Sequence, residues 1–307
     1  MPGKPIPALE HTDPPIQNDI QYSRFSYKVD RVIYDHFSKY QQIQVYETAG
    51  LGRILVLDGV TQLAESDEYV YHEMLTHVPS LYHPMPTRTM VIGGGDGCTL
   101  REVEKYKQVK IITQCEIDKE VIQTAKKYFA TTNKNSYNDK RLNLHIGPAE
   151  QYIKTMKKKS MDVIICDSTE YNPNEPVSEL LYGESFYTSI YDVLDENGIF
   201  TTLGINITPG KQYKNNFNMQ ALDTILHRMG KIFDSTVVHY FPAHSYAWTY
   251  MCMFVGFKGK NPLPSLTELT KRYKTHKLKT KYYTPLVHAA TLIDPKKDFR
   301  SIYPMSE

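Results

Sequence analysis

Hydrophobic and polar residues alternate along the chain in a pattern that predicts two structural parts. From residue 21 to residue 65, short alternating runs around the turn Ala49-Gly50-Leu51-Gly52 predict a small antiparallel sheet. Residues 67–81 carry apolar side chains at helical spacing, and the prolines of His83-Pro84-Met85-Pro86 end that segment. We therefore expect a proline-rich N-terminal arm, then a small β domain, then a larger domain. The expected bounds are 1–19, 20–83 and 84–307.

Beyond residue 84, strand-like apolar runs alternate with amphipathic segments. The expected strands are 89–93, 109–116, 142–146, 161–167, 198–203, 237–241 and 251–257. The expected helices are 118–130, 149–156, 184–194 and 217–232. This alternation predicts an α/β fold with a seven-stranded, methyltransferase-like (Rossmann-type) doubly wound sheet. In such a sheet the loops that follow parallel strands gather at one edge, where ligands bind.

The first strand of this series ends in Gly93-Gly94-Gly95-Asp96-Gly97, just before a helix start. Glycines let backbone N–H groups approach a ligand closely, so we expect a nucleotide-like group here. Cys98 occupies the third glycine position of a dinucleotide motif, which weakens an NAD hypothesis. Because the carboxylate of Asp96 would repel pyrophosphate and attract a cation, the stretch fits a sulfonium nucleoside better.

Acidic residues also follow the neighbouring strands. Glu116 lies 23 residues after Gly93, close to the spacing at which an acid binds ribose hydroxyls. The alternative for Glu116 is a helix cap, a role that Asp118 could fill instead. Asp167 ends an apolar strand, where burial would raise its pKa and suit a general base, with a capping role as the alternative. Together with Glu170 it would form an anionic pocket suited to an amine.

The sequence does not decide the roles of two segments that contain histidine, one around His72 and one around His244. On spacing alone, His72 in Tyr71-His72-Glu73 fits a hydrogen-bonded structural residue better than a catalyst. No second histidine stands at metal-ligand spacing, so we expect no metal. The aromatic cluster from His244 to Trp248 fits either core or site. The polar segment from Ser168 to Glu184 follows a candidate catalytic strand and is a candidate lid.

Composition narrows the class of protein. The net charge of +2 comes from mixed charges, so neither nucleic acid nor a membrane is indicated as a partner. The four cysteines show no C-x-x-C spacing and fit reduced, buried thiols. No signal-like segment and no apolar run of about 18 residues is present. We therefore expect a cytoplasmic protein.

Several motifs in fixed order resemble the spermidine synthase (polyamine aminopropyltransferase) family over about residues 20–295. They are Tyr40-Gln41-Gln42-Ile43, Leu57-Asp58-Gly59-Val60-Thr61-Gln62, Asp67-Glu68-Tyr69-Val70-Tyr71-His72-Glu73, Gly93-Gly94-Gly95-Asp96-Gly97, Cys115-Glu116-Ile117-Asp118, Asp162-Val163-Ile164-Ile165-Cys166-Asp167-Ser168-Thr169 and Val287-His288-Ala289-Ala290.

The resemblance implies that an amine attacks the aminopropyl carbon of decarboxylated S-adenosylmethionine and that methylthioadenosine leaves. This donor would be a co-substrate, with no permanently bound cofactor. The implied catalytic residues are Asp167 as proton acceptor and Tyr71 at the junction of the two substrates. The donor residues implied are Gln41, His72, Gly93, Gly95, Asp96, Glu116, Ile117, Pro148 and Ala149. The acceptor residues implied are Glu170, His244 and Tyr246. A homodimer or homotetramer, built partly through the N-terminal sheet, is also implied.

The chain departs from the family pattern at several positions. Pro148 stands where an Asp usually contacts adenine, Glu170 replaces the second acid of Asp-Ser-Ser-Asp, and Leu203 replaces a Gln. Pro242-Ala243-His244-Ser245 replaces Pro-Thr-Tyr-Pro, and Tyr246-Ala247-Trp248 looks more like the thermospermine or spermine synthase branch. The acceptor therefore stays open between putrescine and spermidine.

Two other functions remain as alternatives. An amine N-methyltransferase that uses S-adenosylmethionine itself resembles the same motifs, although the carboxylate of that donor would meet the like charge of Asp96. A catalytically weak homologue that acts as a binding or regulatory partner is supported only by Pro148 and Leu203.

Overall fold

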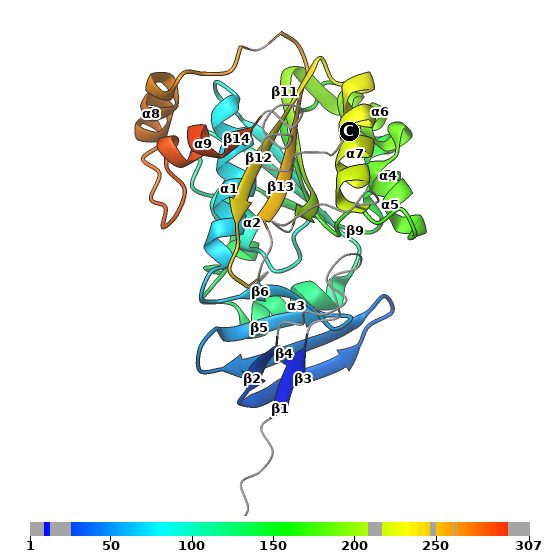
Figure 1. Cartoon of the computed structure of the whole chain (residues 1–307). Coiled ribbons are helices and arrows are strands. Elements are labelled where there is room, and N and C mark those ends of the chain that lie inside the picture. Colours follow the sequence, from blue (N-terminus) through cyan, green and yellow to red (C-terminus); the bar gives the residue numbers. More distant parts are fainter. Residues whose placement is uncertain (1–8, 13–25, 208–216, 246–249, 261, 294–307) are drawn as a thin grey trace, which may run out of the picture.

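An eight-stranded sheet forms the larger part of the protein in the computed structural model, which describes residues 9–12, 26–207, 217–245, 250–260 and 262–293 (Figure 1). Its order is β14-β12-β13-β11-β10-β7-β8-β9. The strands are β7 (Arg88–Gly93), β8 (Ile111–Glu116), β9 (Leu142–Ile146), β10 (Met161–Asp167), β11 (Leu194–Ile207), β12 (Ser235–Pro242), β13 (Tyr250–Phe257) and β14 (Leu292–Ile293). Strands β7 to β11 are parallel, and β13 runs antiparallel between β11 and β12. The predicted seven-stranded fold is confirmed, and β14 adds a two-residue edge strand.

Helices cover both faces of this sheet, as Figure 1 shows. They are α1 (Glu68–Tyr82), α2 (Cys98–Val103), α3 (Lys119–Tyr128), α4 (Ala149–Thr155), α5 (Pro176–Tyr182), α6 (Glu184–Val193), α7 (Phe217–Ile232), α8 (Leu266–Thr275) and α9 (Pro285–Thr291). In β7, Met90 and Ile92 pack in one core with α4 to α7, whereas Val91 packs in a second core with α1, α2 and α8. Because successive residues of a strand point to opposite faces, a strand covered on both sides reads as one continuous apolar run.

A smaller antiparallel sheet precedes the large one, as predicted. Its strands are β3 (Arg31–Phe37), β4 (Gln42–Thr48), β5 (Gly52–Leu57) and β6 (Val60–Ala64). Within the expected N-terminal arm only residues 9–12 are described; they form β1 (Leu9–Thr12), which pairs with β2 (Ser26–Val29). The small sheet packs on α3 through Val45 and Leu55, which share a core with Val121 and Phe129. This contact fixes the small sheet beside the carboxyl edge of the large one.

Helix α1 packs against the large sheet, although we expected it to close the small domain. Its buried Met74 and Val78 share a core with Val163 and Ile165 of β10. The division after residue 83 stays a prediction, and this packing favours an earlier one near residue 67.

The far end of the chain also fastens α1. The carboxylate of Glu73 accepts backbone N–H groups of Lys281, Tyr282 and Tyr283 at 2.7, 2.8 and 2.8 Å. A segment about 200 residues further along the chain therefore helps to hold this helix in place.

Three helices were not predicted, namely α5, α8 and α9. The first lies inside the segment from Ser168 to Glu184 that we expected to be a lid. Tyr182, which is almost fully buried, anchors α5 by donating its hydroxyl to the carbonyl oxygens of Thr169 and Leu203 at 2.7 and 2.5 Å. In the part of the chain that the structure describes, no helix is both long and apolar enough to cross a membrane.

Candidate active site

The candidate site lies between β7 and β10, which are paired in the sheet. From β7 the chain continues to β8 and β9 on one side, whereas β10 lies on the other side. Ligands of open α/β sheets bind at such a point, where the strand order changes direction. The backbone N–H of Gly94 donates to the carbonyl oxygen of Asp167 at 2.7 Å. A Cβ atom on Gly93, whose φ is +75°, would lie only 2.1 Å from that oxygen. Glycine is therefore required at residue 93, and the close approach brings Asp167 against the glycine loop.

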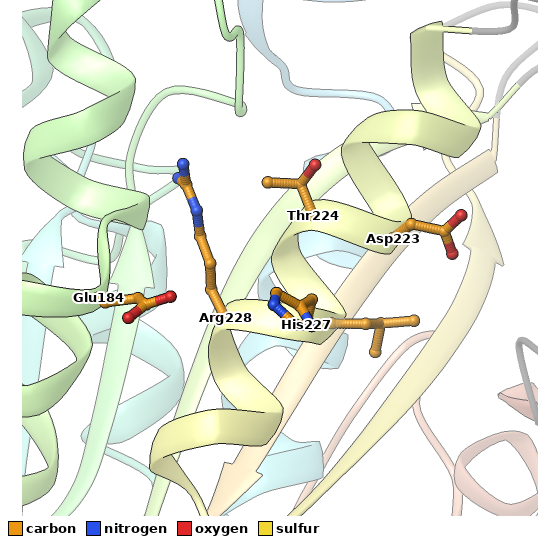
Figure 2. A pocket seen from close by; sticks show the side chains of 6 residues that line it. Glu184, Asp223, Thr224, His227 and Arg228 are labelled. Carbon is orange, nitrogen blue, oxygen red and sulfur yellow. The ribbon is translucent and has the colours of Figure 1, made fainter.

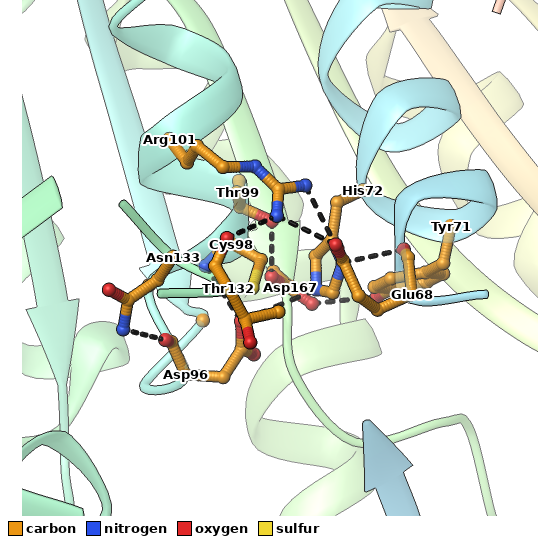
Figure 3. A network of polar contacts seen from close by, with 12 residues as sticks. Glu68, Tyr71, His72, Asp96, Cys98, Thr99, Arg101, Thr132, Asn133 and Asp167 are labelled. Atoms are coloured by element: carbon orange, nitrogen blue, oxygen red, sulfur yellow. Dashed lines mark hydrogen bonds and ion pairs between the residues drawn. The ribbon is translucent and has the colours of Figure 1, made fainter. Parts of the chain in front are cut away.

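Asp167 is held by two hydroxyl groups (Figure 3). Tyr71 donates to Oδ1 at 2.7 Å and Thr99 donates to Oδ2 at 2.5 Å. Burial and the nearby carboxylate of Asp96 together raise the pKa of Asp167. A carboxylate with a raised pKa and a fixed orientation is suited to accept a proton. Thr99 was not predicted; its position in the first turn after the glycine loop is the signal that could have found it.

Asp96 turns its carboxylate toward α1. Its Oδ1 accepts the backbone N–H of Cys98 at 2.7 Å and lies 3.4 Å from Nε2 of His72. Asn133 donates to its carbonyl oxygen at 2.9 Å. Burial works to raise the pKa of Asp96, but the charge of His72 and the N–H of Cys98 outweigh it and lower that pKa. Asp96 is therefore an anion at neutral pH, as the attraction of a cation requires.

A buried ion-pair network that we did not predict lies behind these residues (Figure 3). The guanidinium of Arg101 donates to both carboxylate oxygens of Glu68 at 2.7 and 2.9 Å. It also donates to Glu102 at 2.8 Å and to the carbonyl oxygen of Thr132 at 2.7 Å. The pKa of Glu68 is lowered, because hydrogen bonds and charges of His72 and Arg101 outweigh the opposing effect of burial.

Glu116 and Gln41 meet at the donor side of this edge. Glu116 is buried, accepts the backbone N–H of Asp118 at 2.9 Å, and would lie 2.9 Å from a Cβ added to Gly95. Burial raises the pKa of Glu116 to about 7. The side chain of Asp118 caps α3 by accepting the N–H of Glu120. Capping was the alternative role for Glu116, and Asp118 fills it instead. Gln41 donates to Asp118 at 3.1 Å, which places it at the same edge.

Three further residues that we expected to bind the donor are Ile117, Pro148 and Ala149. Ile117 follows Glu116 and is 40% exposed. Pro148 precedes α4 and offers no side-chain cap, and its carbonyl oxygen accepts the N–H groups of Gln151 and Tyr152. Ala149 is buried. Pro148 therefore has no polar side-chain atom for adenine, and its carbonyl is already used by the helix.

The residues expected on the acceptor side have different surroundings. Glu170 accepts a hydrogen bond from Asn206 at 3.2 Å, and burial raises its pKa. Leu203, which we expected on the acceptor side, is 3% exposed and packs in the core shared with α1. His244 is exposed, and Tyr246 lies outside the described residues.

A cavity of about 550 Å³ lies elsewhere, between α6 and α7 (Figure 2). Its lining residues are Glu184, Asp223, Thr224, Leu226, His227 and Arg228. None of the predicted site residues lines it. Of its charged lining groups, Arg228 pairs with Glu179 at 2.7 Å and Glu184 pairs with Lys231 at 2.6 Å, which are ordinary surface ion pairs.

Two family models match the chain in order. The model described as spermidine synthase tetramerisation domain matches residues 15–65, and the spermine/spermidine synthase domain matches residues 68–266.

Curated relatives match over most of their length. A polyamine aminopropyltransferase of Clostridium tetani is 34% identical, over 91% of this chain and 94% of the relative. One of Thermococcus onnurineus is 36% identical, over 88% and 89%.

A solved spermidine synthase in complex with the transition-state analogue AdoDATO has a TM-score of 0.83 and 31% identity, covering 98% of this chain and 97% of that one. Spermidine synthase from Thermotoga maritima gives a TM-score of 0.82 at the same identity and coverage. With both family models matched in order and curated relatives above 30% identity along nearly the whole chain, the protein belongs to the spermine/spermidine synthase family of polyamine aminopropyltransferases.

Proposed function

We propose that the protein transfers an aminopropyl group from decarboxylated S-adenosylmethionine to putrescine or spermidine. The products would be spermidine or a longer polyamine, together with methylthioadenosine. The observation that carries the proposal is the pair of carboxylates at the ends of β7 and β10: Asp96 with a lowered pKa and Asp167 with a raised one. Two carboxyl groups whose environments push their pKa values apart can take different roles, one binding a cation and the other accepting a proton.

Asp167 acts as the base in this proposal. An aliphatic ammonium has a pKa of about 10.4, so almost none of the acceptor is nucleophilic at neutral pH. Asp167 takes a proton from the acceptor ammonium, and the freed nitrogen lone pair attacks the aminopropyl carbon next to sulfur. The carbon–sulfur bond breaks, its electron pair stays on sulfur, and neutral methylthioadenosine leaves. Tyr71, which donates to Asp167 at 2.7 Å, orients the carboxylate where the two substrates meet.

The donor would lie along the edge formed by the ends of β7, β8 and β9. In this placement Asp96 and His72 receive the aminopropyl ammonium, and Glu116 accepts hydrogen bonds from the ribose hydroxyls. The remaining donor residues of the proposal are Gln41, Gly93, Gly95, Ile117, Pro148 and Ala149. Because Pro148 offers no polar side chain, the adenine would be held by shape and by backbone groups.

The acceptor would extend from Asp167 toward Glu170, with His244 and Tyr246 completing its binding site. Glu170 is partly exposed and accepts a hydrogen bond from Asn206. A carboxylate there would pair with a second positive charge of the polyamine.

One incubation tests the proposal. Purified protein is mixed with decarboxylated or intact S-adenosylmethionine and with putrescine, spermidine or agmatine, and products are identified by mass. We expect aminopropylated product only with the decarboxylated donor. Methylated product with the intact donor would make the protein an N-methyltransferase instead. No turnover with any pair would leave a binding or regulatory role.

We also propose that the protein assembles as a dimer or tetramer through the N-terminal sheet. Strand β3 is an edge strand of that sheet, and it exposes Val32 at 43% and Phe37 at 69%. Large exposed apolar side chains on an unpaired edge favour association. A cytoplasmic location is likewise a proposal, supported by the four cysteines, all of them free and buried.

A further inference from the structure

Both ring nitrogens of His72 face oxygen atoms (Figure 3). Nδ1 lies 2.7 Å from the carbonyl oxygen of Glu68 and 2.9 Å from its carboxylate oxygen Oε2. Nε2 lies 3.4 Å from Oδ1 of Asp96. Carbonyl and ionised carboxylate oxygens only accept hydrogen bonds, so each ring nitrogen must carry a hydrogen for these contacts to be attractive. The geometry is therefore that of an imidazolium cation.

The groups that face His72 from all the packed elements support this charge. Its titratable and charged neighbours are Glu68 and Tyr71 on α1, Asp96 in the glycine loop, Cys98 on α2 and Asp167 at the end of β10. Arg101 reaches it only through Glu68, whose carboxylate it keeps ionised. Burial works to lower the pKa of His72, but Asp96 and Glu68 outweigh that effect and raise it well above its usual value.

The same contacts set up a competition for Asp96. One ligand atom from each of His72, Asp96 and Asp167 lies within 4.8 Å of the others. A donor ammonium placed against Asp96 would thus stand next to the imidazolium, and two cations would share one carboxylate. Like charges at this separation disfavour each other strongly in a water-poor site. Loss of the Nε2 proton relieves the repulsion and turns Nε2 into an acceptor for an N–H of the ammonium.

We propose that His72 holds a proton against Asp96 in the ligand-free protein and releases it to solvent when the ammonium of the donor binds there. The inference rests on the proposed function, because it takes Asp96 to be the ammonium-binding group. In this step the Nε2–H bond breaks, the electron pair stays on the ring, and the proton passes to water. Neutral His72, Asp96 and Asp167 then offer three acceptors to the three N–H groups of the ammonium.

Isothermal titration calorimetry measures this release directly, in buffers of different ionisation enthalpy at pH 7. The matched ligands are decarboxylated S-adenosylmethionine and methylthioadenosine, which lacks the aminopropyl ammonium. Both ligands carry the ribose that would meet Glu116, whose pKa is about 7, so any proton that Glu116 loses is common to both. We expect the donor to release about one proton per molecule bound more than methylthioadenosine does. The donor affinity should accordingly rise more steeply with pH than the methylthioadenosine affinity.

Two variants assign the proton to a residue. His72→Gln should release no more protons with the donor than with methylthioadenosine, because the amide keeps a polar contact but cannot titrate. Asp167 is the other group close to the bound ammonium whose pKa is raised, so it is the alternative source of the proton. The Asp167→Asn variant should still release the proton when the donor binds. If the release disappears in Asp167→Asn and persists in His72→Gln, the proton comes from Asp167 and the inference is wrong.

A measurement on the unaltered protein guards against a misfolded variant. With labelled histidine, the NMR signals of His72 should change from the imidazolium to the neutral form on donor binding. His77, which contacts Glu102 and Tyr106 at 2.8 and 2.9 Å, serves as a reference that should not change. Donor binding that releases no more protons than methylthioadenosine binding would overturn the inference and leave the proposed function standing. Failure of both ligands to bind would instead refute the proposed function, and the inference would fall with it.

Discussion

Replacing Asp167 by asparagine separates proton transfer from substrate binding. The amide has nearly the same shape, so its oxygen can accept the hydroxyl of Tyr71, which now lies 2.7 Å from Oδ1. The hydroxyl of Thr99, 2.5 Å from Oδ2, can rotate to accept from the amide nitrogen. The fold and the donor contacts of Asp96 should therefore survive. What disappears is the only carboxylate that the proposed mechanism uses as a base.

The size of the loss follows from the acceptor. With a pKa of about 10.4, roughly one acceptor amine in 2,500 is neutral at pH 7. Without a base, the variant depends on that fraction, so kcat should fall by about 10² to 10⁴. This corresponds to about 2.7–5.4 kcal/mol of activation free energy. The residual rate of the variant should rise about tenfold per pH unit, because the neutral fraction does.

Product formation is followed by mass over pH 7–9, and donor affinity is measured by calorimetry. We expect a donor Kd within about tenfold of the unaltered protein, because the amide oxygen can still accept an N–H of the donor ammonium and only the charge of that contact is lost. A kcat that stays within a factor of ten, or a pH dependence parallel to that of the unaltered protein, would show that Asp167 is not the base. Equal loss of donor affinity would show that it mainly binds the donor.

Three further results are expected. Glu116→Gln should weaken the binding of methylthioadenosine and of the donor equally, because both carry the ribose. The loss should be roughly 1.5–3 kcal/mol, the contribution of a charge-assisted hydrogen bond, and kcat at saturation should not change. A change confined to the acceptor KM would contradict the ribose role. Arg101→Met removes one of the two cationic partners of the buried Glu68 and leaves it with His72. The free energy of unfolding in urea titrations should fall by about 3 kcal/mol. A loss below about 1 kcal/mol would show that the pair contributes little. Burial lowers the pKa of His239 and His288, that of the latter to about 3. Below a pH of about 6.5 the unfolded chain therefore binds more protons than the folded protein, so the folded protein is most stable above that pH. As the pH decreases, each of the two histidines should lower the free energy of unfolding by up to about 1.4 kcal/mol per pH unit. Unfolding curves that do not change between pH 7 and 5 would rule this out.

The sequence was most informative where the fold repeats a simple pattern. Strands β7 and β10 are covered on both faces, so their apolar runs were unambiguous. In the small sheet, β5 is also buried on both faces, with Leu55 in one core and Ile54 and Val56 in another. Helices α5 and α9 were missed because each has only seven residues, too few to show a helical period, and α8 was missed because most of its residues are polar. The packing of α1 could not be predicted either, since an amphipathic helix shows that it is buried but not against what.

The site residues were predicted less completely than the fold. Asp96, Glu116 and Asp167 lie at strand ends, and topology alone brings such positions to one edge. The support of Asp167 by Thr99, and the imidazolium of His72 held between Glu68 and Asp96, depend on side-chain directions that spacing does not specify. Spacing alone favoured a structural role for His72, and its contact with Asp96 shows that it also faces the proposed donor site. Leu203 was expected on the acceptor side because it replaces a polar residue; its side chain is buried, and its place beside the acceptor stays a prediction.

The three hydrogen bonds from residues 281–283 to Glu73 bear on how the protein is made. Helix α1 carries Tyr71 and His72, yet its anchor leaves the ribosome about 200 residues later. Contacts between such distant segments form late in folding, because a long loop must close first. A nascent chain can thus complete its N-terminal sheet early, while the residues that would meet the substrates gain their final positions only after residues 281–283 have been made. Chains that stop before residue 281 should lack activity for this reason.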